Sequence, residues 1–201
     1  MNLVPEFDDA IAVLQVSKSE QEHAVVAMAQ VVSDCFQRGG KLLICGNGGS
    51  AADSQHMAAE LVSSFMAGLA RPALPAIALT TDTSILTAYS NDFGYEQVFA
   101  RQVEALGAPG DCLLAISTSG NSQSVIRAAE VARAQELKVL ALTGQQPNAL
   151  VESADQAVCI PSSDTQAIQT AHLVVEHAIC RMVESAILNS SRSAESKEEY
   201  S

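Results

Sequence analysis

The chain of 201 residues lacks tryptophan and has few other aromatic residues and few cations. Aromatic residues make up 4% of the sequence, and 11 Lys and Arg stand against 23 Asp and Glu, for a formal net charge of -12. A surface that holds nucleic acid needs clustered cations, and anionic membrane surfaces attract cations too. The composition therefore argues against nucleic acid and membrane as partners, and at first sight against small anionic substrates.

Long apolar runs are also absent. No stretch reaches the roughly 18 apolar residues of a membrane span, and residues 1–9 lack the basic start and apolar run of a signal peptide. The five cysteines form no CxxC pair and lie in apolar segments. We expect reduced, buried cysteines in a cytoplasmic protein. With 48% apolar residues, the chain can build a sizeable core.

Short apolar runs without alternation recur along the chain, each followed directly by small polar residues. They lie at residues 41–45, 75–79, 112–116, 138–142 and 156–160. Such runs predict strands covered on both faces, as in a parallel sheet. Helical patterns separate most of them, at about 50–66, 83–90, 94–105 and 122–135. The expected fold is α/β, a three-layer doubly wound parallel sheet of five strands.

Helical patterns also flank this α/β core, which we place at residues 41–188. Residues 5–38 predict an N-terminal extension of two helices, with Ser19 as the cap between them. A final helix is expected over about 166–188, and the Ser- and Glu-rich residues 189–201 are expected to be frayed. No linker-like stretch divides the chain, so residues 1–201 are expected to form a single domain.

Two loops after predicted strands are candidates for binding a phosphate. Residues 117–122 place four hydroxyl side chains between a strand and a helix. Hydroxyl groups and the free N–H groups of a helix start bind an anion without any cation. The alternative is a simple N-cap by Ser119 or Asn121, but one cap needs one such residue. The glycine-rich residues 46–50 either bring backbone N–H groups to the same ligand or only connect a strand to a helix.

The titratable candidates lie on two predicted helices. His56 and Glu60 are four residues apart and share one helix face. Gln169 and His177 are eight apart, a rise of about 12 Å, so their side chains can clamp an ion between them. A lone His is more often structural, and a His-x-x-x-Glu pair is common on helices, so the residues alone leave both interpretations open. His172 has a different azimuth and is expected to pack in the core.

Together these motifs resemble the sugar isomerase (SIS) domain family, and more closely the phosphoheptose isomerases. The resemblance covers roughly residues 20–188, and its anchors are residues 45–56 with Glu60, 91–95, 117–122, and 168–169 with His172 and His177. It implies a flavodoxin-like fold and a homotetramer with active sites at subunit contacts. It also implies conversion of sedoheptulose 7-phosphate to D-glycero-D-manno-heptose 7-phosphate through an enediol. That reaction is the first step toward the ADP-heptose of bacterial surface polysaccharide such as lipopolysaccharide.

The resemblance implies roles for individual residues as well. Glu60 and His177 correspond to the acid/base pair. One zinc ion per subunit is implied, bound by His56, Glu60, Gln169 and His177, either for chemistry or to fix the geometry of the site. Contacts with the sugar phosphate are implied for Asn47, Gly48, Gly49, Ser50, Asn91, Asp92, Ser117, Thr118, Ser119, Ser122 and Gln169.

Some residues depart from the family pattern. Ser64 stands where the family commonly has an Arg four residues after Glu60, and the apolar segment 66–70 is about two residues longer than usual. Thr170 replaces a Glu, and residues 145–148 replace a Gly-rich run. A lost cation would weaken binding or change the sugar, so an isomerase of another phosphosugar stays open.

A non-catalytic SIS-domain protein that binds the bacterial replication initiator is a further alternative, as is a sugar-phosphate sensor. Retention of Glu60 together with the other three implied zinc ligands favours an enzyme. The net charge of -12 is compatible with a phosphosugar if hydroxyl and N–H groups hold the phosphate.

Overall fold

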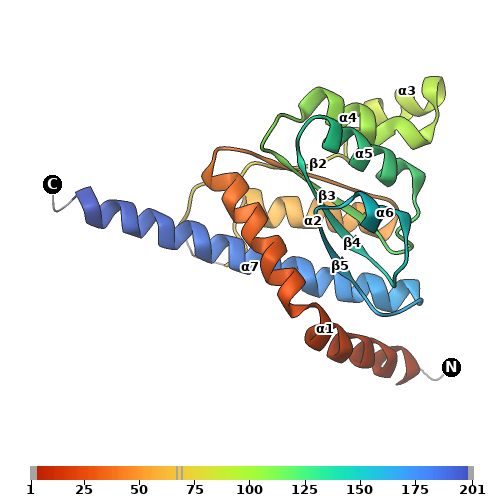
Figure 1. The fold of residues 1–201 in the computed structure, drawn as a ribbon, viewed down its shortest axis with the longest axis horizontal. Helices are drawn as coiled ribbons and strands as arrows, with labels where there is room; N and C mark the ends of the chain where they lie inside the picture. Colours follow the sequence, from red (N-terminus) through yellow and green to blue (C-terminus); the bar gives the residue numbers. More distant parts are fainter. Residues whose placement is uncertain (1–3, 67, 69, 199–201) are drawn as a thin grey trace.

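A five-stranded parallel sheet forms the centre of the protein (Figure 1). The computed structural model describes residues 4–66, 68 and 70–198, with side chains only as far as residue 190. Strand order is β2-β1-β3-β4-β5. The strands are β1 (Leu42–Gly46), β2 (Ala76–Ala78), β3 (Cys112–Ser117), β4 (Lys138–Thr143) and β5 (Gln156–Cys159). All five agree with the predicted strands to within one residue at each end.

Helices cover both faces of the sheet, as the non-alternating strands predict. Leu42 and Ile44 pack into the layer formed with α1, α2 and α7, whereas Leu43 and Cys45 point the other way, toward α4, α5 and α6. The helices are α1 (Val4–Gln37), α2 (Gly49–Val62), α3 (Thr83–Phe93), the 3-10 helix η1 (Tyr95–Gln97), α4 (Val98–Leu106), α5 (Gln123–Ala134), α6 (Ala149–Ser153) and α7 (Thr165–Glu198).

The two terminal helices correct the sequence-based prediction. The N-terminal extension is one continuous helix, α1, and the Ser19 hydroxyl donates to Val16 O within it at 2.9 Å rather than capping a second helix. The final helix continues through Glu198, past the end expected at residue 188, while residues 199–201 lie outside the described part. Figure 1 shows α1 and α7 crossing beside the sheet, each with one end extending beyond it.

The cysteines and the helices agree with the expectations drawn from composition. Cys35, Cys45, Cys112, Cys159 and Cys180 are free and buried. Within residues 4–66 and 70–198, no helix has both the length and the apolar character needed to cross a membrane.

Candidate functional site

The strand order creates a crevice between the ends of β1 and β3. The chain leaves β1 into α2 on one face of the sheet, and leaves β3 into α5 on the other. At such a switch point the two connecting loops diverge, and ligands of doubly wound sheets bind there, beyond the carboxyl ends of the strands. Both sequence-predicted phosphate loops lie at this position, residues 46–50 after β1 and 117–122 after β3.

Hydrogen bonds join the two loops across the crevice. Asn47 Nδ2 donates to Ser122 Oγ at 2.8 Å and to Ser124 Oγ at 3.0 Å. Asn47 Oδ1 in turn accepts a hydrogen bond from the hydroxyl of Tyr95 at 2.6 Å. A cavity of about 160 Å³ opens at this junction, lined by Asn47, Ser50, Ile116, Ser117, Thr118, Ser119 and Ser122. Except for Ile116, its lining is polar and contains no cation.

The hydroxyl-rich loop does not serve as a helix cap, so the capping alternative is wrong. Ser122 occupies the N-cap position of α5, yet its side chain makes no capping hydrogen bond. The Asn121 side chain donates from Nδ2 to Ser119 O and accepts at Oδ1 from the N–H of Ala149. Ser119 Oγ accepts a hydrogen bond from the N–H of Asn121. The start of α5 therefore lacks a side-chain cap, which is the arrangement an anion would complete.

Two glycines shape the first loop. Gly48 has a φ of +57°, a conformation that residues with a Cβ rarely adopt. At Gly49 an added Cβ would lie 2.1 Å from Gln169 Nε2. Glycine at residue 49 thus lets the Gln169 side chain lie directly against the loop.

His56, Glu60 and His177 come together where α2 and α7 pack side by side. The two imidazoles meet edge to face at an angle of 68°, with their Nε2 atoms at hydrogen-bond distance, 2.9 Å, and their ring centroids 5.2 Å apart. Glu60 Oε1 is 3.8 Å from His56 Nε2. The His56 and Glu60 side chains are 43% and 24% exposed to solvent, so a ligand can reach them. The structure thus brings together three of the four residues that the resemblance implies as zinc ligands.

Gln169, the fourth predicted zinc ligand, is directed elsewhere. It lies against Gly49 and forms a hydrogen bond with the Asp53 carboxylate. In the part of the chain that the structure describes, no three His, Cys, Asp or Glu side chains form a preformed metal site. The structure therefore brings three of the four predicted ligands near one another. The fourth, Gln169, lies beside the glycine-rich loop after β1 instead.

Two buried carboxylates next to this group escaped the sequence analysis. Burial raises the pKa of Asp53, against the opposing effects of Gln169 and His56. Glu176 is fully buried, and burial and the nearby Asp53 charge raise its pKa to about 8. Neither Glu176 oxygen has a hydrogen-bond partner among the described residues. A signal did exist for Asp53, because it precedes His56 and Glu60 by three and seven residues on the same helix face.

Asn91 and Asp92 are not brought to the crevice. Both are exposed near the end of α3, and Asn91 Nδ2 donates to Asp92 Oδ1 at 2.8 Å. The contact from this segment is made instead by Tyr95, whose hydroxyl reaches Asn47. His172, by contrast, behaves as expected: it is fully buried with Nε2 3.0 Å from Thr143 O, and burial lowers its pKa to about 4.

A buried ion pair fixes the loop that follows α2. Arg71 Nε lies 2.6 Å from Glu184 Oε1, and the two side chains are 1% and 0% exposed. Arg71 also donates to the backbone oxygen of Glu60 at 2.9 Å. Glu184 accepts from the N–H groups of Phe65 and Met66 and from the Ser64 hydroxyl. Ser64 thus has a structural role in the loop; Ala67 and Leu69 of the lengthened segment 66–70 lie outside the described residues.

Comparison with known proteins identifies the family to which this chain belongs. The sequence profile of the SIS domain family matches residues 7–144. The chain therefore belongs to the SIS domain family, and relatives that match most of its length are phosphoheptose isomerases. One from Roseiflexus sp. (strain RS-1) is 53% identical over 182 residues, covering 90% of this chain and 91% of the relative. Another, from Chlorobaculum tepidum, is 53% identical over 161 residues, covering 80% and 77%.

Solved structures agree with this assignment. A phosphoheptose isomerase from Neisseria gonorrhoeae aligns with a TM-score of 0.85 at 40% identity, over 91% of this chain and 97% of that one. One from Francisella tularensis aligns with a TM-score of 0.87 at 36% identity, over 92% and 100%. Within the SIS domain family, this chain belongs to the phosphoheptose isomerases.

Proposed function

We propose that the protein converts sedoheptulose 7-phosphate to D-glycero-D-manno-heptose 7-phosphate, a precursor of the ADP-heptose used in surface polysaccharide. The observation that carries the proposal is the placement of a carboxylate and two imidazoles on α2 and α7, the two helices whose N-terminal ends lie at the cation-free, hydroxyl-lined crevice. The crevice suits a phosphate, and the carboxylate and imidazoles suit proton transfer. The reaction needs both at the two ends of one substrate.

The chemistry assigns one role to each group. A base removes a proton from C1 of the ketose, leaving an enediolate across C1 and C2, and a proton is then delivered to C2. The C1 hydroxyl loses its proton while the C2 oxygen gains one. Glu60 is the proposed base for the carbon-bound proton, and His177 is its acid/base partner at the oxygens. Both face the same exposed position between α2 and α7.

The donor set at this position also fits zinc. Two imidazole nitrogens and one carboxylate oxygen are ligands that zinc accepts, and the facing Nε2 atoms of His56 and His177 are close enough to share an ion. His56, Glu60 and His177 would hold the metal, with Gln169 joining after a rotamer change away from Asp53. Bound zinc would supply a Lewis acid for the substrate oxygens. Metal analysis of the purified protein tests this directly, and sub-stoichiometric zinc with unchanged activity would contradict it.

One pair of substitutions tests which loop binds the phosphate. Ser119→Ala and Ser122→Ala each remove a hydroxyl that lines the crevice, so the Michaelis constant for the sugar phosphate should rise about 10- to 150-fold, in line with a lost hydrogen bond to a charged group. The catalytic rate constant should change less. Ser19→Ala is the control, because that hydroxyl bonds only to its own helix. Unchanged Michaelis constants for both crevice variants would move the phosphate to another loop.

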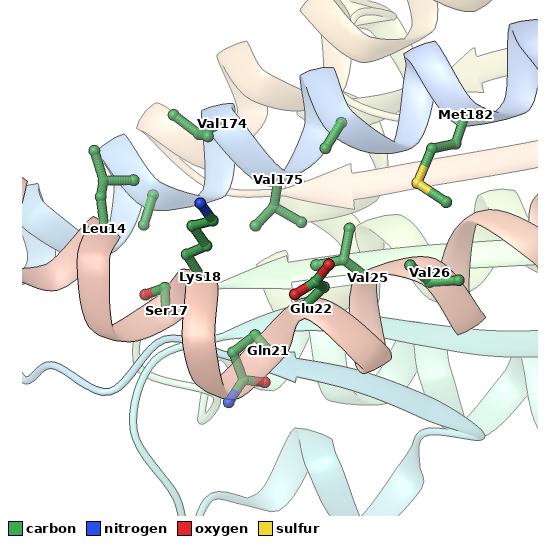
Figure 2. Close-up of a pocket in the computed structure, with 12 residues that line it drawn as sticks. Leu14, Ser17, Lys18, Gln21, Glu22, Val25, Val26, Val174, Val175 and Met182 are labelled. Carbon is green, nitrogen blue, oxygen red and sulfur yellow. The ribbon is translucent and has the colours of Figure 1, made fainter.

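We further propose that the protein assembles as a homotetramer through α1 and α7. Phe7 and Ile11 are 71% and 52% exposed, and they lie on the face of α1 that is continuous with buried Met28 at heptad spacing. A groove of about 300 Å³ between the two helices extends this surface, and Figure 2 shows Leu14, Val25, Val175 and Met182 along it. A second copy offers the same apolar helix face, so light scattering should give a multiple of the chain mass, and a monomeric mass would contradict the proposal.

A coupled assay tests the function as a whole. Sedoheptulose 7-phosphate and other ketose phosphates are offered in parallel, with and without a chelator. The proposal expects turnover of the heptulose phosphate in preference to the others. Preference for a different ketose would make the protein an isomerase of another phosphosugar. No turnover of any substrate would favour a binding protein instead, such as one that contacts the replication initiator.

A further inference from the structure

Five of the nine Lys and Arg residues with described side chains pair with carboxylates. Arg71, Lys41 and Lys138 pair with acidic side chains from other segments. Arg101 and Arg127 pair with acidic residues one turn away on their own helices. Arg181 is one of the other four, with Lys18, Arg38 and Arg133: its guanidinium is exposed and has no carboxylate partner among the residues with described side chains.

Arg181 lies at the reacting end of the proposed site. It follows His177 by four residues on α7, so it occupies the same helix face about 6 Å further along the axis. The loop after α2 meets it there. Phe65 packs its ring 5.7 Å from the ring of His177, and the Arg181 guanidinium lies 5.5 Å from the centroid of the same phenyl ring.

Phe65 thus contacts both groups, packing against the His177 ring and making a cation–π contact with the Arg181 guanidinium. The position of Phe65 is itself fixed, since its N–H donates to the buried Glu184 at 3.2 Å. Residue 64, in the loop after α2, is Ser and carries no charge, and its hydroxyl donates to Met66 O and to Glu184. Arg71, the other cation in this region, is buried and paired with Glu184, so the exposed positive charge here comes from Arg181 on α7.

We propose that Arg181 supplies the positive charge that stabilises the enediolate at the reacting end of the substrate. The inference rests on the proposed isomerase function. Negative charge develops on the C1 and C2 oxygens only as the proton leaves carbon, so a cation fixed beside His177 acts mainly on the transition state. Phe65 is a positioning residue that acts through Arg181. The phosphate, at the far end of the substrate, depends on the crevice instead.

The experiment compares three full-length variants, Arg181→Gln, Arg181→Lys and Phe65→Leu, with the wild-type protein in the sedoheptulose 7-phosphate assay. Arg181→Gln should lower kcat about 10-fold while the Michaelis constant changes less than about twofold, as expected when stabilisation specific to the transition state is lost. Arg181→Lys keeps a cation that can also lie over the Phe65 ring, so it should retain clearly more of kcat than Arg181→Gln. Arg101→Gln, which removes an exposed guanidinium on α4, is the matched control and should leave kcat unchanged.

A double-mutant cycle separates the two residues. If Phe65 acts through Arg181, then Phe65→Leu should lower kcat in the wild-type background and have little further effect in the Arg181→Gln background. Additive losses would contradict the positioning role of Phe65. Wild-type-like kcat for Arg181→Gln, or equal losses for Gln and Lys, would overturn the role of Arg181. A wild-type protein without turnover would instead refute the proposed function, so the two failures are distinguishable.

Discussion

Replacement of Glu60 by Gln is expected to lower kcat by about 10²- to 10⁴-fold, the contribution usual for a general base. The amide is isosteric with the carboxylate but cannot accept the carbon-bound proton. The Glu60 side chain on α2 is 24% exposed, and its Oε1 lies 3.8 Å from His56 Nε2. Because the side chain reaches solvent, the substitution should leave the fold intact. Stopped assays with purified protein, together with far-UV circular dichroism, measure both effects.

His177→Gln should give a comparable loss, and the double variant should be little worse than either single one, because the two groups act as a unit. Glu104→Gln on α4 is the matched control, since it removes an exposed carboxylate that pairs only with Arg101. Near-normal rates for both Glu60→Gln and His177→Gln would refute the proposed mechanism.

Replacement of Arg71 by Met should destabilise the protein by about 3–5 kcal/mol. The substitution leaves the Glu184 carboxylate buried without its ion-pair partner, and it removes the donor to the backbone oxygen of Glu60 near the end of α2. Burial alone would raise the pKa of Glu184, yet the hydrogen bonds from Arg71, Met66 and Phe65 hold it below its ordinary value. The pair's contribution is therefore present at neutral pH and is lost as pH falls through the lowered pKa.

Urea denaturation followed by circular dichroism, at one protein concentration, measures this difference. Lys138→Met is the matched control, because it breaks the exposed pair with Asp155 and should cost at most about 1 kcal/mol. Equal costs for the two variants would show that the Arg71–Glu184 pair is no more than a surface contact.

The sheet and its loops could be predicted from the sequence because their signals are local. Continuous apolar runs such as residues 112–116 occur only where both faces of a strand are covered, and small polar residues end each run. The hydroxyl-rich residues 117–122 follow β3, so their place at the switch point follows from the topology. The spacing of His56 and Glu60 likewise placed both on one face of α2.

Other features depend on packing that spacing cannot express. Ser19 has the composition of a cap, but the apolar face of α1 continues across it to pack on α7, and tertiary packing outweighs a weak local preference. Gln169 is long enough to be a zinc ligand. Its rotamer is set instead by the absence of a side chain at Gly49, against which it lies, and by its interaction with the nearby Asp53. Asn91 and Asp92 were assigned by resemblance alone, and in the structure they lie exposed near the end of α3.

The central claim is that Glu60 drives an aldose–ketose isomerisation of a heptose phosphate. Proton NMR of the wild-type protein with sedoheptulose 7-phosphate in D₂O tests it most directly. The account predicts that the aldose heptose 7-phosphate accumulates with solvent deuterium at C2, and that Glu60→Gln forms it at least about 100-fold more slowly. A ketose that the wild-type protein leaves unchanged, or an aldose formed equally fast by Glu60→Gln, would contradict it.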